Sequence, residues 1–130
     1  MIAKQIQRDI EEINYWDARV LRMDSCFFGD EVAIVFEDTD ENIKVLFTGC
    51  SVFSFKTHVN DRLKPLKELV KSQIPYFIQD IEIEDIQVEG KSLLKCKIQM
   101  PPLDVELVCS NIILERISKD EAPDIHSNYF

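Results

Sequence analysis

The sequence predicts an α+β domain in which about six strands form an antiparallel sheet and two helices cover one of its faces. Three observations support this class. Apolar and polar residues alternate along several short segments, which is the period of a half-buried strand. Turn-forming residues separate these segments, so neighbouring strands should be joined by short connections. The start of the chain instead carries apolar side chains at helical spacing. A partly closed β-barrel is the alternative arrangement for the same strands.

The two predicted helices span residues 2–14 and 61–72. The second has leucines at helical spacing, and it tolerates Pro65 only because the first turn of a helix does not need that N–H donor. The first carries an apolar stripe that a sheet of the same chain can cover. Four isoleucines form this stripe, at spacings of four, four and three residues: Ile2, Ile6, Ile10 and Ile13.

The first strands are predicted on either side of Gly29-Asp30, which is a turn signal. A strand over residues 16–28 precedes this turn. A strand with clean alternation follows it over residues 31–37. The polar residues 39–42 should then form a hairpin loop.

From Ile43 onward, the apolar residues keep one phase across Gly49 as far as Phe55. This pattern indicates either one long strand bent at the glycine or two separate strands. Side chains on the apolar phases of the strands should form the core. Those predicted are Val32, Ile34, Phe36, Val45, Phe47, Ile98 and Leu107.

The second half of the chain repeats the strand pattern. A strand is predicted over residues 77–89, and its apolar residues change from odd to even numbers at Asp85, which indicates a bulge there. After a turn at residues 89–92, further alternating strands follow over residues 94–100 and 104–109.

Residues 1–117 are therefore predicted to form one domain, and the polar residues 118–130 to be a frayed tail. The chain has 15 basic and 24 acidic residues, and its net charge is −9. Proteins that bind nucleic acid or anionic membranes usually carry basic patches, so neither partner is expected. No apolar run approaches a membrane span or a signal peptide, which favours the cytoplasm.

Four cysteines lie beside strand-like sequence and form no Cys-x-x-Cys pair: Cys26, Cys50, Cys96 and Cys109. Reduced core thiols are therefore favoured over disulfides or metal ligands. The pair His58 and Asp61 does not complete a known metal-binding spacing, and His126 lies in the tail. No nucleophile motif or glycine-rich phosphate loop is present. We therefore expect no catalytic residues, no metal and no cofactor.

A partner-binding surface is the remaining expectation. Tryptophan is enriched at the centres of protein interfaces, but a large aromatic that closes the core is the favoured interpretation of Trp16. Acidic residues cluster in the predicted loop around residues 37–41, and a second group lies on the strand over residues 77–89. The predicted contact residues are Trp16, Asp17, Glu37, Asp38, Asp40, Glu41 and Tyr76.

Four segments carry a family resemblance: W-D-A-R-V at 16–20, G-D-E-V-A-I-V-F at 29–36, I-K-V-L-F-T-G at 43–49 and I-x-D-I-x-I at 78–83. In these segments the chain resembles the Bacillus YxiG-like proteins and the similar immunity proteins of bacterial polymorphic toxin systems. The resemblance implies a cytoplasmic binding protein that neutralises a toxin domain and has no cofactor or catalytic residues. We expect a basic partner, because the chain is acidic.

Two other functions are left open by the sequence. The first is a structural module that self-associates, for example as a homodimer, through an exposed sheet edge. The second is an enzyme whose site is assembled from scattered carboxylates.

Overall fold

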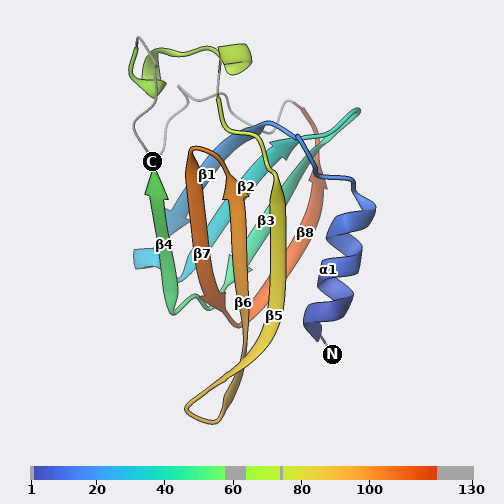
Figure 1. Ribbon diagram of the computed structural model, residues 1–130, viewed down its shortest axis with the longest axis vertical. Helices are drawn as coiled ribbons and strands as arrows, with labels where there is room; N and C mark the ends of the chain where they lie inside the picture. The colour runs from blue at the N-terminus through green and yellow to red at the C-terminus, as the bar shows by residue number, and fades with distance from the viewer. Residues whose placement is uncertain (1, 58–63, 74, 120–130) are drawn as a thin grey trace.

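In the part of the chain that the structure describes, eight strands form two four-stranded antiparallel sheets that face each other, with one α-helix at their side (Figure 1). The computed structural model describes residues 2–57, 64–73 and 75–119. The α+β class is as predicted, but the expectation of about six strands in one sheet is wrong. Neither sheet closes into a barrel. The first sheet has the order β1 (Val20–Cys26), β2 (Glu31–Glu37), β3 (Asn42–Thr48) and β8 (Asn111–Ile117). The second sheet has the order β4 (Val52–Thr57), β7 (Leu103–Cys109), β6 (Lys91–Met100) and β5 (Asp80–Val88).

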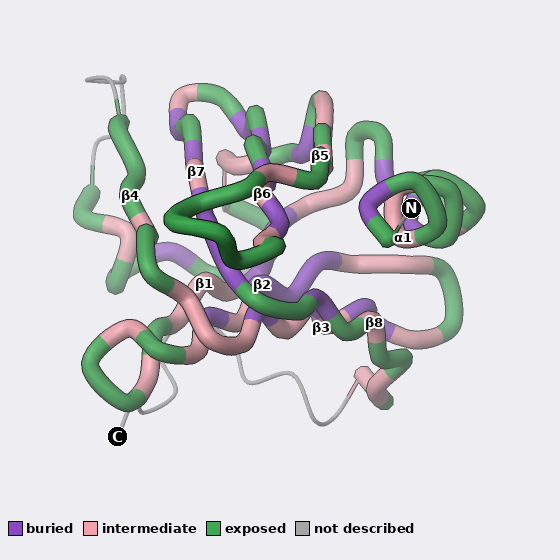
Figure 2. The backbone as a smooth tube through the Cα atoms, turned by 90° about the horizontal axis from the view of Figure 1, so that it is seen from below, coloured by how far each residue is buried: buried purple, intermediate pink, exposed green. Residues whose placement is uncertain are grey.

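The core lies between the two sheets, where Figure 2 shows the buried residues gathered. All seven predicted core side chains are buried, each no more than 3% exposed. Their neighbours follow from the register: Ile34 of β2 lies opposite Val45 of β3, and Ile98 of β6 lies opposite Val105 of β7. The alternation in the sequence therefore identified the inward faces correctly, although it did not reveal that these faces belong to two sheets.

The connection at Gly49 explains why the chain forms two sheets. β3 ends just before this glycine, and β4 begins in the opposite sheet just after it. Gly49 has a φ of +64°, and an added Cβ would clash with the side chain of Ser110. Ser110 lies between β7 and β8, where the chain crosses back, and its N–H donates to the carbonyl of Thr48 at 2.9 Å. Of the two possibilities at Gly49, separate strands is the correct one.

The hairpin of β5 and β6 extends beyond the first sheet (Figure 1). Its turn has φ values of +51° at Glu89 and +82° at Gly90, which suit a tight two-residue hairpin. The register runs without a shift through Asp85, so the predicted bulge is wrong. Asp85 is exposed and accepts a hydrogen bond from the backbone N–H of Ala3 at 3.3 Å, while Ile86 and Val88 of the other phase are half-buried and exposed, respectively.

Helix α1 (Ile2–Glu12) covers the open edge at β5 instead of a sheet face (Figure 2). Ile10 is buried, and Ile6 and Ile13 are half-buried against the core. Ile2 is 64% exposed, so the predicted stripe holds only from its second member onward. Gln7 fixes the helix to the strand: its side-chain amide donates to the carbonyl of Ile81 at 2.8 Å, and its oxygen accepts from the N–H of Ile83 at 2.7 Å.

The predicted middle helix is also wrong where the structure describes it. Residues 64–73 contain two short 3₁₀ turns, Leu66–Glu68 and Lys71–Gln73, separated by Leu69 in an extended conformation. Leu69 is buried, but Val70 is 54% exposed, so no continuous apolar stripe forms. A short isolated helix is marginal without such a stripe. The rest of the helix prediction and most of the predicted tail lie outside the described residues.

Candidate partner-binding surface

Most of the predicted contact residues gather at one end of the sandwich. The segment before β1 runs alongside the segment before β5, where the N–H of Asp17 donates to the carbonyl of Ile78 at 2.8 Å. The N–H of Val20 donates to the carbonyl of Tyr76, also at 2.8 Å. The backbone of Glu37 joins this group through the carbonyl of Arg19, at 2.9 Å. The backbone therefore brings the Trp16-Asp17 pair, Tyr76 and the start of the acidic loop together.

The aromatic residue that closes the core at this end is Tyr15, not Trp16. Tyr15 is 1% exposed, and its hydroxyl accepts from the N–H of Ile81 at 3.1 Å and donates to an Asp80 carboxylate oxygen at 3.4 Å. Burial raises the pKa of Tyr15 to about 12. Trp16 is 45% exposed and stacks on Tyr15, with the ring centroids 4.3 Å apart. The favoured interpretation of Trp16 as a core residue is therefore wrong.

Tyr76 is half-buried and packs between the main core and a small cluster formed by Leu21 and Val35. Next to it, Phe77 is 37% exposed and lies under the guanidinium of Arg19, 5.0 Å from its ring centroid. Both aromatic residues already have intramolecular packing partners. Trp16 is thus the more accessible of the two predicted aromatic contacts.

The acidic loop between β2 and β3 is partly neutralised. Asp38 pairs with Arg116 of β8 at 3.2 Å, and its backbone carbonyl accepts from the ammonium of Lys119 at 2.6 Å. Asp40 is exposed and Glu41 is half-buried at the tip. Asn42 was predicted to belong to this loop, but it is the first residue of β3 and is fully buried.

The second acidic group, on β5, faces a row of lysines. The register places Glu82 opposite Lys97 and Glu84 opposite Lys95 on the outer face of the second sheet. Directly opposed residues of unlike charge attract one another across a strand pair. These carboxylates are therefore balanced locally, which weakens the expectation that they form an acidic contact surface.

The structure shows two exposed aromatic residues that the sequence interpretation missed. Phe27 and Phe28 follow β1 and form a 3₁₀ turn with Gly29, where a strand was predicted. Phe27 is 70% exposed and Phe28 is fully exposed. Their φ values are +53° and +57°, in the left-handed region that residues with a Cβ seldom adopt. The sequence offers one signal, a Phe-Phe pair placed directly before a Gly-Asp turn.

All four cysteines are free. Cys96 and Cys109 are buried as predicted, whereas Cys26 and Cys50 are only partly covered. Burial raises the pKa of Cys109 to about 12, and it also raises the pKa of Cys96 and of Cys50. Among the described residues, no three His, Cys, Asp or Glu side chains are placed to hold a metal ion, and His58 lies outside those residues.

A small cavity lies between the sheets and α1. Only apolar side chains and one thiol line it, including Ile10, Phe47, Ile81 and Cys96. A catalytic pocket needs converging polar groups, and this cavity has none among its lining residues. It is therefore an imperfection of core packing. The surface offers the better candidate for a functional site.

A comparison with models of protein families matches nearly the whole chain. A family model described as Immunity protein PIM7 matches residues 2–116, which include the helix and the described strands except for Ile117, the last residue of β8. No curated protein matches the sequence. No helix in the described part of the chain is long and apolar enough to cross a membrane.

Proposed function

The chain belongs to the immunity protein PIM7 family, and from this premise we propose that it binds a toxin domain directly and thereby neutralises it. The family match over residues 2–116 is the observation that carries the proposal. On this proposal the chain acts by occupying a surface of the toxin and performs no chemistry of its own. Its place of action is the cytoplasm, where a toxin made by the same or a competing bacterium would meet its target.

The charge distribution supports a basic partner. Seven of the 24 acidic residues and none of the 15 basic residues lie between residues 23 and 43. This stretch runs from β1 through the phenylalanine turn and β2 to the acidic loop and the start of β3. Asp24 and Asp38 of this stretch already pair with Arg22 and Arg116, and the remaining acidic residues would raise the rate at which a basic protein docks, because opposite potentials steer the encounter. A toxin that acts on nucleic acid would carry such a basic surface.

Within the predicted contact group, we propose the loop tip and Trp16 as the accessible elements. Asp40 is exposed at the tip, and Trp16 is 45% exposed. Asp38 and Tyr76 contribute less, because one already pairs with Arg116 and the other packs between two apolar clusters. Asp17 and Glu37 then serve mainly to join the segments through their backbone hydrogen bonds.

The direct test is whether the chain protects cells that express the toxin. The toxin gene that neighbours the gene for this chain is expressed with and without the chain, and growth is compared. The two purified proteins are then mixed and the mass of the complex is measured by light scattering. Restored growth and a stable complex are the expected results. A toxin that remains lethal and forms no complex would refute the proposal. Light scattering of the chain alone measures the competing expectation of self-association through an open sheet edge.

A further inference from the structure

The turn after β1 exposes more apolar surface than the fold requires. Phe28 is fully exposed and Phe27 is 70% exposed, so their rings gain little by folding. The other exposed phenylalanines among the described residues have aromatic or cationic partners: Phe77 lies under Arg19, and Phe55 contacts Phe53 with the ring centroids 5.7 Å apart. Two adjacent, solvated phenylalanines therefore need an explanation outside the fold of this chain.

The backbone of the same turn is strained. Two consecutive residues with a Cβ adopt left-handed φ values, which glycine or asparagine would adopt at lower energy. Two backbone hydrogen bonds of Asp30 fix the conformation of the turn. The N–H of Asp30 donates to the carbonyl of Phe27 at 3.1 Å, and the carbonyl of Asp30 accepts from the N–H of Cys50 at 2.9 Å. Strain that is held in place by its surroundings commonly marks a functional position.

The surroundings of the turn define the chemistry of its partner. Asp30 and Glu31 follow the phenylalanines directly, and Asp24 precedes them on β1. The guanidinium of Arg22 pairs with Asp24, and no other basic residue follows in sequence until Lys44. A partner complementary to this turn would present an apolar pocket, with basic groups facing Asp30 and Glu31.

We propose that Phe27 and Phe28 are the hydrophobic anchor through which this chain holds its toxin, inserted into an apolar pocket whose rim is basic. The inference rests on the proposed function and adds the contact that supplies affinity. Aromatic side chains that enter a pocket at the centre of an interface usually carry most of the binding energy, whereas surrounding charges mainly govern the rate of association.

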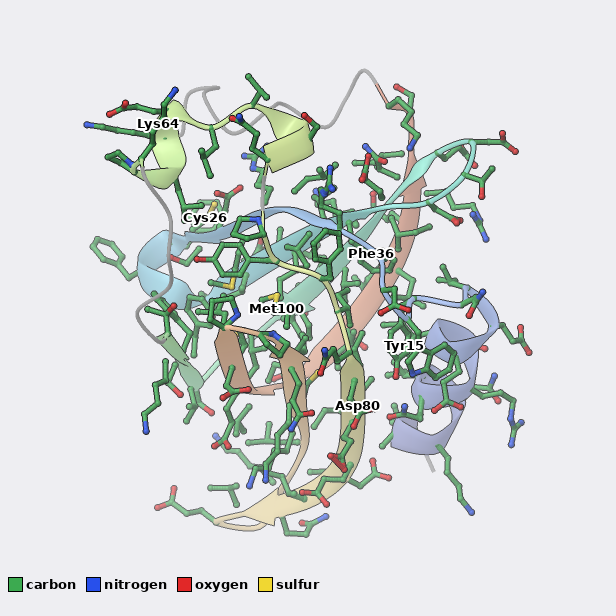
Figure 3. The ribbon with its side chains drawn as sticks, turned by 45° about the horizontal axis from the view of Figure 1, so that its top comes forward. Tyr15, Cys26, Phe36, Lys64, Asp80 and Met100 are labelled. Carbon is green, nitrogen blue, oxygen red and sulfur yellow. The ribbon has the colours of Figure 1, made fainter. Side chains whose placement is uncertain are left out.

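The anchor is distant from the contact group that the sequence predicted. Phe27 and Phe28 precede β2, and the acidic loop follows its other end. Figure 3 shows Cys26, the residue before the turn, well apart from Tyr15, the residue before Trp16. Substitutions at the two places can therefore be separated experimentally.

The test replaces both phenylalanines by asparagine, Phe27→Asn and Phe28→Asn, because asparagine tolerates the left-handed region. The melting temperature should stay the same or rise, while the Kd for the purified toxin domain should increase about a hundredfold, as for an interface hot spot. Ile2→Asn is the matched control: Ile2 is 64% exposed on α1, and its replacement should leave the Kd unchanged.

A second measurement does not depend on affinity. A photo-crosslinking phenylalanine analogue at position 28 should form a covalent adduct with the toxin, and the same analogue at position 2 should not. An unchanged Kd of the double variant, a marked fall in its melting temperature or no adduct from position 28 would each overturn the anchor. Failure of the unmodified chain to bind the toxin would instead refute the proposed function.

Discussion

Replacing Gln7 by alanine tests how α1 is attached to the sandwich. The Gln7 side chain makes two hydrogen bonds to the exposed backbone edge of β5, at 2.8 Å to Ile81 and 2.7 Å to Ile83. Each such bond contributes about 1 kcal/mol net, so their loss should cost about 2 kcal/mol. The higher helix propensity of alanine offsets less than about 0.5 kcal/mol of this. For a domain of this size, the melting temperature should fall by roughly 6 °C.

The matched control lies on the same helix. Gln5 donates to Asp9 at 2.8 Å on the exposed surface, and an exposed pair of this spacing is worth only about 0.2–0.5 kcal/mol. Urea unfolding of Gln7→Ala and Gln5→Ala gives the two free energies. Hydrogen exchange of the Ile83 amide should become faster in Gln7→Ala alone. If the two variants lost equal stability and the amide kept its protection, the helix would not be held by Gln7.

Three further predictions concern charge, thiols and pH. Asp40→Lys should lower the association rate with the toxin severalfold at low salt and little at high salt. Glu82→Lys changes the net charge equally, but it should have a smaller effect because Glu82 lies opposite Lys97. Equal effects of the two variants would remove the loop from the interface. Thiol titration should find Cys96 and Cys109 unreactive until denaturant is added, because both are buried, and rapid reaction in the native protein would contradict their burial. The folded pKa of Tyr15 is raised from 10.0 to about 12, so the stability it contributes is fully present below pH 10 and is lost as the pH rises towards 12. Tyr15→Phe should reduce this loss in alkaline denaturation curves, and identical curves would assign it to other groups.

The sequence correctly predicted the inward side chains of the strands. Val32, Ile34 and Phe36 alternate with less apolar residues, and the alternation alone fixes which residues share a face. It failed at the hairpin of β5 and β6, where Asp85 lies on the same face as the buried Ile81 but is exposed and bonds the N–H of Ala3 in the helix. Periodicity reports which side chains are grouped together, but it does not report what covers them.

The candidate surface was predicted less well than the core. The acidic loop was predicted because charge is visible in the sequence, whereas the core interpretation was favoured for Trp16. Phe27 and Phe28 were assigned to a strand because aromatic residues favour strands. Their exposure depends on a left-handed turn that is fixed by hydrogen bonds to residues far along the chain, such as the bond between Asp30 and Cys50.

Composition and pattern thus determined an acidic α+β protein with a defined set of core residues, and the acidity is the basis on which we propose a basic partner. The tertiary structure alone decided that the strands form two sheets. The chain passes from one sheet to the other near Gly49 and again at Ser110, and these two connections contact each other, as in the hydrogen bond from the N–H of Ser110 to the carbonyl of Thr48. It also decided which charges remain available for a partner. Lys97 balances Glu82 only because the register of β5 and β6 places them directly opposite each other. Both outcomes depend on pairings between distant segments, and local side-chain preferences carry no information about those pairings.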